Sequence, residues 1–314
     1  MSVIAVYSIK GGVGKTTTAC DLAWRFAAQG GHRTLLWDLD IQGGAAFMLG
    51  ESQPRSPRAA AAFRPGGLLR QQVQGTRFDR LFLLPADPSL RILPNQLAQM
   101  RQRNRLDWLT DFLSGEFRRI VLDCPPALNE VSDQVIAAAD LIVVPLPASP
   151  LSMRALDAIR QELAHNHLRP PPILPVLTMY DPRRAIHRET RATLAQDWPV
   201  VPLSGYVEQT AVRRAPIDTF APNCNGARAL GQLFDRVETR LAELQQGPDR
   251  ASRPVPTRMV PPRGDRAAAA DGVPAHLIAP LPEARPLLRP EPRRRRLEGL
   301  RGTARRLLQW ILRV

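Results

Sequence analysis

The sequence contains no run of hydrophobic residues long enough to cross a membrane. Nowhere do the roughly 18 consecutive apolar residues of a membrane-spanning helix occur. The first ten residues show neither the basic leader nor the hydrophobic segment of a secretory signal. We therefore expect a cytoplasmic protein.

Cysteine is scarce, with three residues in the whole chain. They are odd in number and lie far apart, and no two of them form a Cys-x-x-Cys pair. This pattern argues against a zinc site and against a redox dithiol. We therefore expect reduced, buried, structural thiols at Cys20, Cys124 and Cys224.

Lysine is the rarest charged residue, because arginine fills every one of the 43 basic positions except Lys10 and Lys15. A lysine ammonium is a compact charge on a flexible stem, and a planar guanidinium does not replace it at every kind of site. Both lysines fall within six residues of each other. We therefore expect a special role for the stretch from Lys10 to Lys15.

Hydrophobic segments alternate along the chain between strand-like and helix-like patterns. The 314 residues, 44% of them hydrophobic, suffice for one main domain of about 200 to 250 residues with an appendage. Continuous apolar strands separated by helices predict an α/β fold with a mostly parallel sheet and helices on both faces. We expect strands at residues 2–7, 34–37, 80–84, 119–122, 141–145, 173–178 and 200–203, and helices at residues 16–28, 95–113, 130–139, 151–166, 183–196 and 226–246.

The composition changes after residue 246. Residues 247–292 hold 11 of the 31 prolines, and residues 250–314 hold 15 arginines against five acids, which accounts for most of the net charge of +14. We expect a disordered linker at 247–292, because such a segment cannot bury a core. In residues 293–314, leucine and isoleucine recur at three- and four-residue intervals after four arginines, which predicts a basic amphipathic helix. The main domain is thus predicted to span residues 1–246.

A glycine-rich segment lies between the first strand and the first helix, which is the context of a phosphate-binding loop. Its backbone N–H groups and the helix N-terminus favour an anionic phosphate, so a nucleotide is expected there. Lys15 would reach the β- and γ-phosphate oxygens, and the Thr16 hydroxyl would bind Mg²⁺. The residues expected to bind the nucleotide are Gly11, Gly12, Val13, Gly14, Lys15, Thr16 and Thr17.

The complete motif Lys-Gly-Gly-Val-Gly-Lys-Thr-Thr resembles the deviant Walker A loop of the ParA/MinD ATPases, a family of P-loop NTPases. In that family the first lysine crosses a dimer interface to the partner's nucleotide. The resemblance therefore implies catalytic roles for Lys10 and Lys15, ATP and Mg²⁺ as ligands, and a homodimer in the ATP-bound state. An ordinary solvated lysine is the alternative for Lys10. The resemblance covers about residues 1–245, and Thr178-Met179-Tyr180-Asp181 favours the ParA branch.

The strand at residues 34–37 ends in a second segment that resembles this family, Asp-Leu-Asp-Ile-Gln. The resemblance implies that Asp40 orients the attacking water and contributes to the metal site. It also implies that Asp38 belongs to the switch region that senses the γ-phosphate. Ile41 replaces the proline usual in the family, which affects loop rigidity more than chemistry.

A third match lies at the end of the strand at residues 119–122. Asp123 follows this strand and resembles the Walker B aspartate, which implies a water-mediated contact with Mg²⁺ beside Thr16. A binding protein with an inactive ATP site is a competing hypothesis, which the intact lysines and aspartates argue against. An iron–sulfur electron carrier would need differently placed cysteines, and a related tyrosine kinase would need a tyrosine-rich tail.

By resemblance, the function is that of a ParA-type ATPase that dimerises on ATP, cycles on and off a scaffold and positions DNA or another cargo. A ParB-like or other activating partner would stimulate its weak hydrolysis. Non-specific DNA would bind electrostatically, with Arg213 and Arg214 as candidate contacts, so the protein would be nucleoid-associated. Alternatively, residues 293–314 would anchor a MinD-like ATPase to anionic lipid on the inner face of the membrane, or dock on a protein.

Overall fold

The computed structural model describes residues 1–52, 59–64, 69–100, 104–166 and 170–246. Within these ranges the chain forms one sheet of eight strands in the order β3-β4-β2-β5-β1-β6-β7-β8. Every neighbouring pair is parallel except β3–β4. The strands are β1 (Ser2–Val6), β2 (Thr34–Asp38), β3 (Gln74–Gly75), β4 (Leu81–Leu84), β5 (Arg119–Asp123), β6 (Leu141–Pro147), β7 (Ile173–Tyr180) and β8 (Val200–Pro202).

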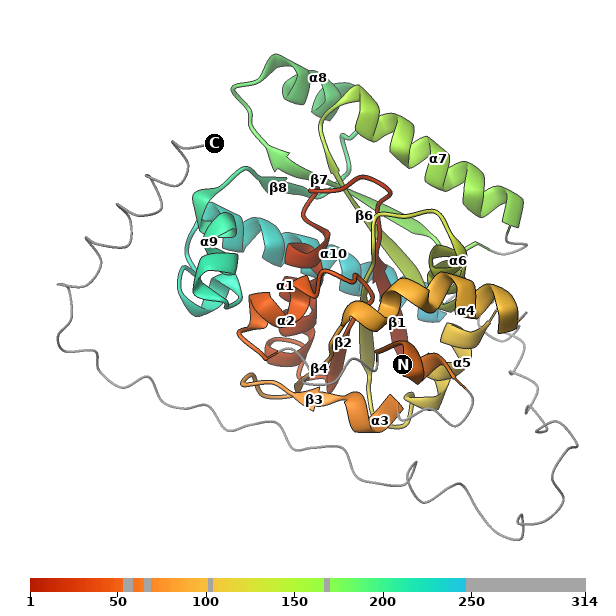
Figure 1. The fold of residues 1–314 in the computed structure, drawn as a ribbon. Coiled ribbons are helices and arrows are strands. Elements are labelled where there is room, and N and C mark those ends of the chain that lie inside the picture. The colour runs from red at the N-terminus through yellow and green to blue at the C-terminus, as the bar shows by residue number, and fades with distance from the viewer. Residues whose placement is uncertain (53–58, 65–68, 101–103, 167–169, 247–314) are drawn as a thin grey trace, which may run out of the picture.

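Helices cover both faces of this sheet (Figure 1). One side carries α1 (Lys15–Ala28), α2 (Gly44–Leu49), α9 (Gly205–Arg213) and α10 (Asn225–Gln246). The other carries α4 (Leu93–Met100), α5 (Arg105–Phe112), α6 (Glu130–Ala138) and α7 (Pro150–Asn166). The shorter elements are α3 (Leu69–Gln72), α8 (Ala185–Thr193) and the 3-10 helices η1 (Ala59–Phe63), η2 (Pro88–Ile92) and η3 (Ile217–Thr219). The predicted α/β fold is confirmed.

The central strands are apolar along their whole length because both of their faces are buried. In β1, Ile4 and Val6 pack into the core beneath α1 and α10. Val3 and Ala5, which alternate with them, pack into the core beneath α4 to α7. Side chains of successive strand residues point to opposite faces, so an unbroken apolar run requires a covering layer on each side.

The structure differs from the sequence prediction in several places. The single helix predicted at 95–113 is described as two helices, α4 and α5, and the short helices α2 and α9 were not predicted. Cys20 and Cys124 are buried as expected, but Cys224 is half-buried, so that part of the cysteine prediction is wrong. The linker predicted at 247–292 and the helix predicted at 293–314 lie outside the described residues. Among the helices that the structure describes, none has the length and hydrophobicity required to cross a membrane.

The topology brings the three predicted motifs to one edge of the sheet. β1, β5 and β2 are adjacent and parallel, and Val6 is paired with Asp123, which is paired in turn with Asp38. Parallel strands have their carboxyl ends at the same edge, so the loop after β1 and both aspartates meet there. In open α/β sheets this edge is the usual place for a ligand.

Candidate functional site

The loop between β1 and α1 has the geometry of an anion cradle. Gly12 and Gly14 adopt positive φ values of 69° and 90°, which side chains of other residues rarely tolerate. A Cβ atom built on Gly11, Gly12 or Gly14 would meet no other heavy atom within 4 Å, so the space beside the loop is open. Gly14 also caps α1 without a side-chain hydrogen bond, which leaves the first N–H groups of the helix for a ligand. The loop therefore fits a phosphate group.

Lys15 lies inside this loop and is only 7% exposed. Its ammonium Nζ donates a hydrogen bond to the carbonyl oxygen of Lys10 at 3.1 Å. Burial lowers the pKa of Lys15, while the nearby carboxylates of Asp123 and Asp40 oppose this shift. A buried ammonium held by one main-chain carbonyl can exchange that contact for phosphate oxygens, which bind a cation more strongly.

Asp123 ends β5 and is completely buried. Neither of its carboxylate oxygens has a hydrogen-bond partner among the described residues, which is rare for a buried charged group. Burial raises the pKa of Asp123; Asp40 raises it further, whereas Thr16 and Lys15 nearby lower it. An unpartnered buried carboxylate beside a hydroxyl and an ammonium indicates a position that awaits a cation or an ordered water.

These residues also fit Mg²⁺. Among the described residues, no group of three or more His, Cys, Asp or Glu side chains is placed to enclose a metal ion. Mg²⁺ does not need such a cage, because it keeps several waters and is usually bound through one or two protein oxygens and the phosphates of its substrate. The Thr16 hydroxyl and the Asp123 carboxylate suit this mode of binding.

The second predicted acidic segment folds over the start of α1. Both oxygens of the buried Asp38 carboxylate accept backbone N–H groups, those of Asp40 and Ala45, at 3.0 Å each. Burial raises the pKa of Asp38, and Asp123 raises it further. A Cβ atom on Gly44 would lie 3.1 Å from Thr16, so this segment approaches the phosphate loop closely. Asp38 therefore organises the loop after β2, and its role as a γ-phosphate sensor stays a prediction.

Asp40 is half-buried at the same edge, and its Oδ1 accepts the N–H of Gln42 at 3.1 Å. This hydrogen bond fixes the orientation of the Asp40 side chain. The Asp40 carboxylate is near enough to Lys15 and Asp123 to affect the pKa of both. This is a suitable place for a carboxylate that orients water. The predicted catalytic role of Asp40 is compatible with its position and stays a prediction.

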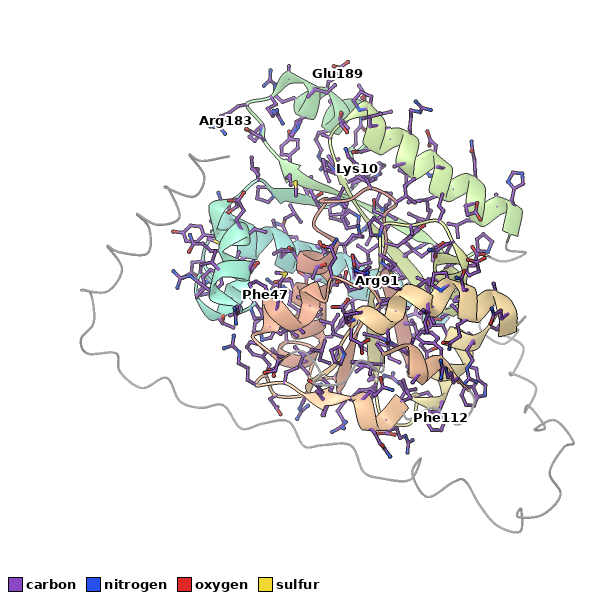
Figure 2. The ribbon with its side chains drawn as sticks, in the orientation of Figure 1. Lys10, Phe47, Arg91, Phe112, Arg183 and Glu189 are labelled. Carbon is purple, nitrogen blue, oxygen red and sulfur yellow. The ribbon has the colours of Figure 1, made fainter. Side chains whose placement is uncertain are left out.

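Lys10 lies at the rim of the loop, on the side of α7 (Figure 2). Its Nζ is 3.4 Å from the Ser149 hydroxyl and 3.3 Å from the Ser152 hydroxyl, near the N-terminus of α7. The side chain is half-exposed, and among the described residues it forms no ion pair with a carboxylate. Two neutral hydroxyls hold an ammonium only weakly, so Lys10 can turn outward.

The remaining predicted residues lie in and beside the loop. Val13 is buried, and its carbonyl accepts a hydrogen bond from the Thr178 hydroxyl of β7 at 2.9 Å. The Thr17 hydroxyl lies 3.9 Å from the sulfur of Met48 in α2. Thr178 was recognised from the sequence only as part of a family motif, because its partner is 165 positions away.

The predicted DNA contacts, Arg213 and Arg214, lie outside the loop at the C-terminal end of α9, and both are exposed. The guanidinium of Arg213 lies 4.8 Å from the ring centre of Phe220, and that of Arg214 lies 4.5 Å from the ring centre of Phe47. In Figure 2, Phe47 projects from α2 towards α9. Arg77 donates a hydrogen bond to the Arg214 carbonyl, so three arginines share this surface.

Residues 1–169, more than half of the chain, match the family model described as "AAA domain". The chain is 32% identical over 251 residues to the chromosome-partitioning ATPase Soj of Thermus thermophilus, covering 76% of this chain and 96% of that protein. It is 28% identical over 260 residues to the chromosome partitioning protein ParA of Caulobacter vibrioides, covering 78% and 97%.

Solved structures show the same fold. Apo McdA of Cyanothece superposes with a TM-score of 0.66 at 22% identity, covering 77% of this chain and 99% of that one. MinD of Pyrococcus horikoshii, solved with Mg-ADP, gives a TM-score of 0.61 at 18% identity and covers 78% and 99%. With the phosphate loop, the adjacent strand-end aspartates and these relatives, the chain belongs to the ParA/MinD family of P-loop ATPases and resembles its ParA branch.

Proposed function

We propose that this protein is an ATP-driven dimerisation switch of the ParA type. Two copies bind ATP and Mg²⁺, associate face to face and hold a scaffold until hydrolysis, stimulated by a ParB-like or other partner, separates them. The output is the positioning of DNA or another cellular cargo. The observation that carries the proposal is the pair of lysines at the loop, with Lys15 buried inside it and Lys10 half-exposed at its rim on two serine hydroxyls.

Each site residue has a distinct role in this scheme. The loop N–H groups bind the β-phosphate, and Lys15 leaves the Lys10 carbonyl for the phosphate oxygens. Thr16 and Asp123 hold Mg²⁺, which when bound neutralises phosphate charge. Asp40 orients the attacking water and accepts its hydrogen bond. Lys10 leaves Ser149 and Ser152 and stabilises charge on the nucleotide of the partner copy.

Exposed apolar side chains around the site support a second copy as the partner. They lie at or shortly after the carboxyl ends of five different strands, on the edge of the sheet that carries the loop. Monomeric proteins rarely gather such side chains around a polar site unless a partner covers them. They are Ile41 (41% exposed), Leu128 (49%), Leu151 (66%), Met179 (38%) and Leu203 (50%).

Non-specific DNA is the proposed scaffold, which would make the protein nucleoid-associated. The exposed Arg213 and Arg214 supply positive charge for phosphates, and residues 250–314 add a net charge of +10 from sequence. The membrane alternative rests on residues 293–314, where four arginines precede a helical apolar pattern. It predicts binding to anionic lipid through that segment.

The decisive experiment measures molar mass by light scattering with and without Mg-ATP. Wild-type protein should double its mass with ATP, and Asp40→Ala should remain dimeric because hydrolysis is blocked. Lys10→Ala should bind ATP with an affinity within about threefold of wild type but hydrolyse it at least tenfold more slowly. A tenfold slower rate corresponds to about 1.4 kcal/mol of lost transition-state stabilisation, as expected for one charged contact. Lys10→Arg tests whether a guanidinium can substitute.

The same ATP-loaded protein is then mixed with DNA and with anionic vesicles. Binding to DNA that falls steeply with salt, and that weakens in Arg213→Gln/Arg214→Gln, supports the DNA scaffold. Binding to vesicles that is lost on removing residues 293–314 supports the membrane alternative. A wild-type protein that stays monomeric with Mg-ATP contradicts the proposed switch.

A further inference from the structure

Thr178, in strand β7, is hydrogen-bonded to the phosphate loop that follows β1, two strands away in the sheet. It lies near the end of β7, is 4% exposed, and its hydroxyl donates to the carbonyl oxygen of Val13 at 2.9 Å. Val13 stands between Gly12 and Gly14, the two loop residues with positive φ. The hydroxyl of Thr178 therefore reaches the middle of the loop. The residue that it holds, Val13, has a conformationally free glycine on each side.

Fixing this carbonyl also fixes the direction of the next N–H group. A peptide unit is planar and trans, so the carbonyl oxygen of Val13 and the N–H of Gly14 point in opposite directions. When the oxygen is held on the side of β7, the Gly14 N–H faces away from β7. Without this hydrogen bond, glycine at position 14 would allow the peptide to rotate at little cost.

The strand end that carries Thr178 is held by contacts on both sides, although its pairing with β8 is irregular between Leu177 and Tyr180. Thr178 is paired with Pro147 in β6, and the carbonyl of Tyr180 accepts the N–H of Leu203 at 2.9 Å. Arg183 forms two hydrogen bonds of 2.9 Å to the carboxylate of Asp181. Such support lets one hydroxyl impose a conformation on a loop that its own glycines leave free.

Met179, next to Thr178, adds a second observation. It has a φ of +54°, a left-handed conformation that a non-glycine residue adopts only where the surroundings enforce it. It is 38% exposed at the same edge of the sheet as the phosphate loop. Strained residues of this kind concentrate where a ligand is held, so the end of β7 has the character of a functional support.

We propose that Thr178 is a positioning residue for the nucleotide: its hydroxyl orients the Val13–Gly14 peptide so that the Gly14 N–H faces the β-phosphate. This inference rests on the nucleotide site of the proposed function. It assigns a role to Thr178, the first residue of the Thr178-Met179-Tyr180-Asp181 motif, which the nucleotide roles of the loop residues leave unexplained.

The test compares Thr178→Val, which keeps the shape and removes the hydroxyl, with Thr178→Ser, which keeps the hydroxyl. Titration calorimetry with Mg-ADP should show about tenfold weaker binding in Thr178→Val, which corresponds to about 1.4 kcal/mol. Thr178→Ser should stay within twofold of wild type. Affinity for AMP, which lacks the β-phosphate and is measured by competition, should be unchanged in both.

Thr76→Val is the matched control. Thr76 is also buried, and its hydroxyl donates to the Leu81 carbonyl at 2.7 Å, at the end of β4 opposite the site. It should lose stability without losing affinity for ADP. Thermal melting of all variants checks folding, and Thr178→Ala replaces Thr178→Val if the latter melts below the assay temperature.

Two outcomes overturn the inference while leaving the nucleotide site intact. One is a hydroxyl-free variant that binds ADP within twofold of wild type. The other is an equal loss of affinity for ADP and AMP, which would indicate a general distortion of the pocket. If wild-type protein itself binds no ADP, the proposed function fails, and the role of Thr178 fails with it.

Discussion

Two buried cations at opposite ends of α1 are held in contrasting ways. The ammonium of Lys15, in the first turn, contacts a single carbonyl, that of Lys10. The guanidinium of Arg25, 2% exposed in the last turn, donates to the Asp21 carboxylate at 2.6 Å, to Asp218, and to the Ala227 carbonyl at 3.1 Å. Lys15 has one contact that it can exchange, whereas Arg25 has three hydrogen-bond partners, two of them carboxylates.

The difference shows how a buried charge indicates a binding site. Arg25 joins α1 to η3 and to the start of α10, and its partners all belong to the chain. Near Arg25 one buried oxygen, Asp21 Oδ1, lacks a hydrogen-bond partner, whereas near Lys15 both oxygens of the Asp123 carboxylate lack one among the described residues. A buried charge satisfied by the fold stabilises the fold, while a buried charge left unsatisfied is tolerated where a ligand completes it.

The largest expected effect comes from Arg25→Gln. Breaking a buried ion pair leaves its carboxylates uncompensated, so the free energy of unfolding should fall by about 3–5 kcal/mol. Urea denaturation measures this fall. Molecules that remain folded should bind Mg-ADP with an affinity within threefold of wild type. Arg240→Gln, at an exposed pair with Glu243, is the control and should change stability by less than about 0.5 kcal/mol.

Lys15→Gln, the matching substitution at the other end of the helix, should have the reverse effect. Affinity for Mg-ADP should fall about 100-fold, because a buried cation makes charge-assisted contacts worth about 1.5–3 kcal/mol each. The free energy of unfolding without nucleotide should change by less than about 1 kcal/mol, since only one carbonyl contact is lost. Calorimetry and urea denaturation on the same preparation measure both. A large loss of stability with little loss of affinity would break the comparison.

The smallest effect, a pH dependence, sharpens the comparison at Arg25. Burial raises the pKa of Asp21 from 3.8 to about 6, although Arg25 opposes the shift. A carboxyl whose pKa is higher in the folded state contributes stability that is complete below about pH 4 and is lost as the pH rises through about 6. Asp21→Asn removes this contribution.

The difference in unfolding free energy between wild type and Asp21→Asn should therefore change by on the order of 2 kcal/mol between pH 4 and pH 7. Urea denaturation at several pH values measures it, and Asp235→Asn on an exposed face of α10 is the control. Parallel stability curves for wild type and Asp21→Asn would show that Asp21 is ionised throughout, with Arg25 fully compensating it.

Much of the fold was predictable because its signals are local. Amphipathic helices of ten or more residues are recognised by the spacing of their apolar residues. Buried strands are recognised by short unbroken apolar runs between turn residues. The short helix α2 was missed, because six residues carry little periodicity. The helix α9 was missed although it is as long as α6 and α8, which were predicted. The prediction of one helix at 95–113 did not separate α4 from α5, because the sequence between them, residues 101–104, contains neither glycine nor proline to mark a helix end.

The sequence by itself determined the phosphate loop and its family, because residues 10–17 are contiguous and contain the three glycines, the two lysines and the two threonines of the motif. Only the tertiary structure decided which distant groups support it. The bond from Thr178 to Val13 spans 165 residues, and the pair of Arg25 with Asp218 spans 193. Such contacts depend on strand order and helix packing, which no local pattern encodes.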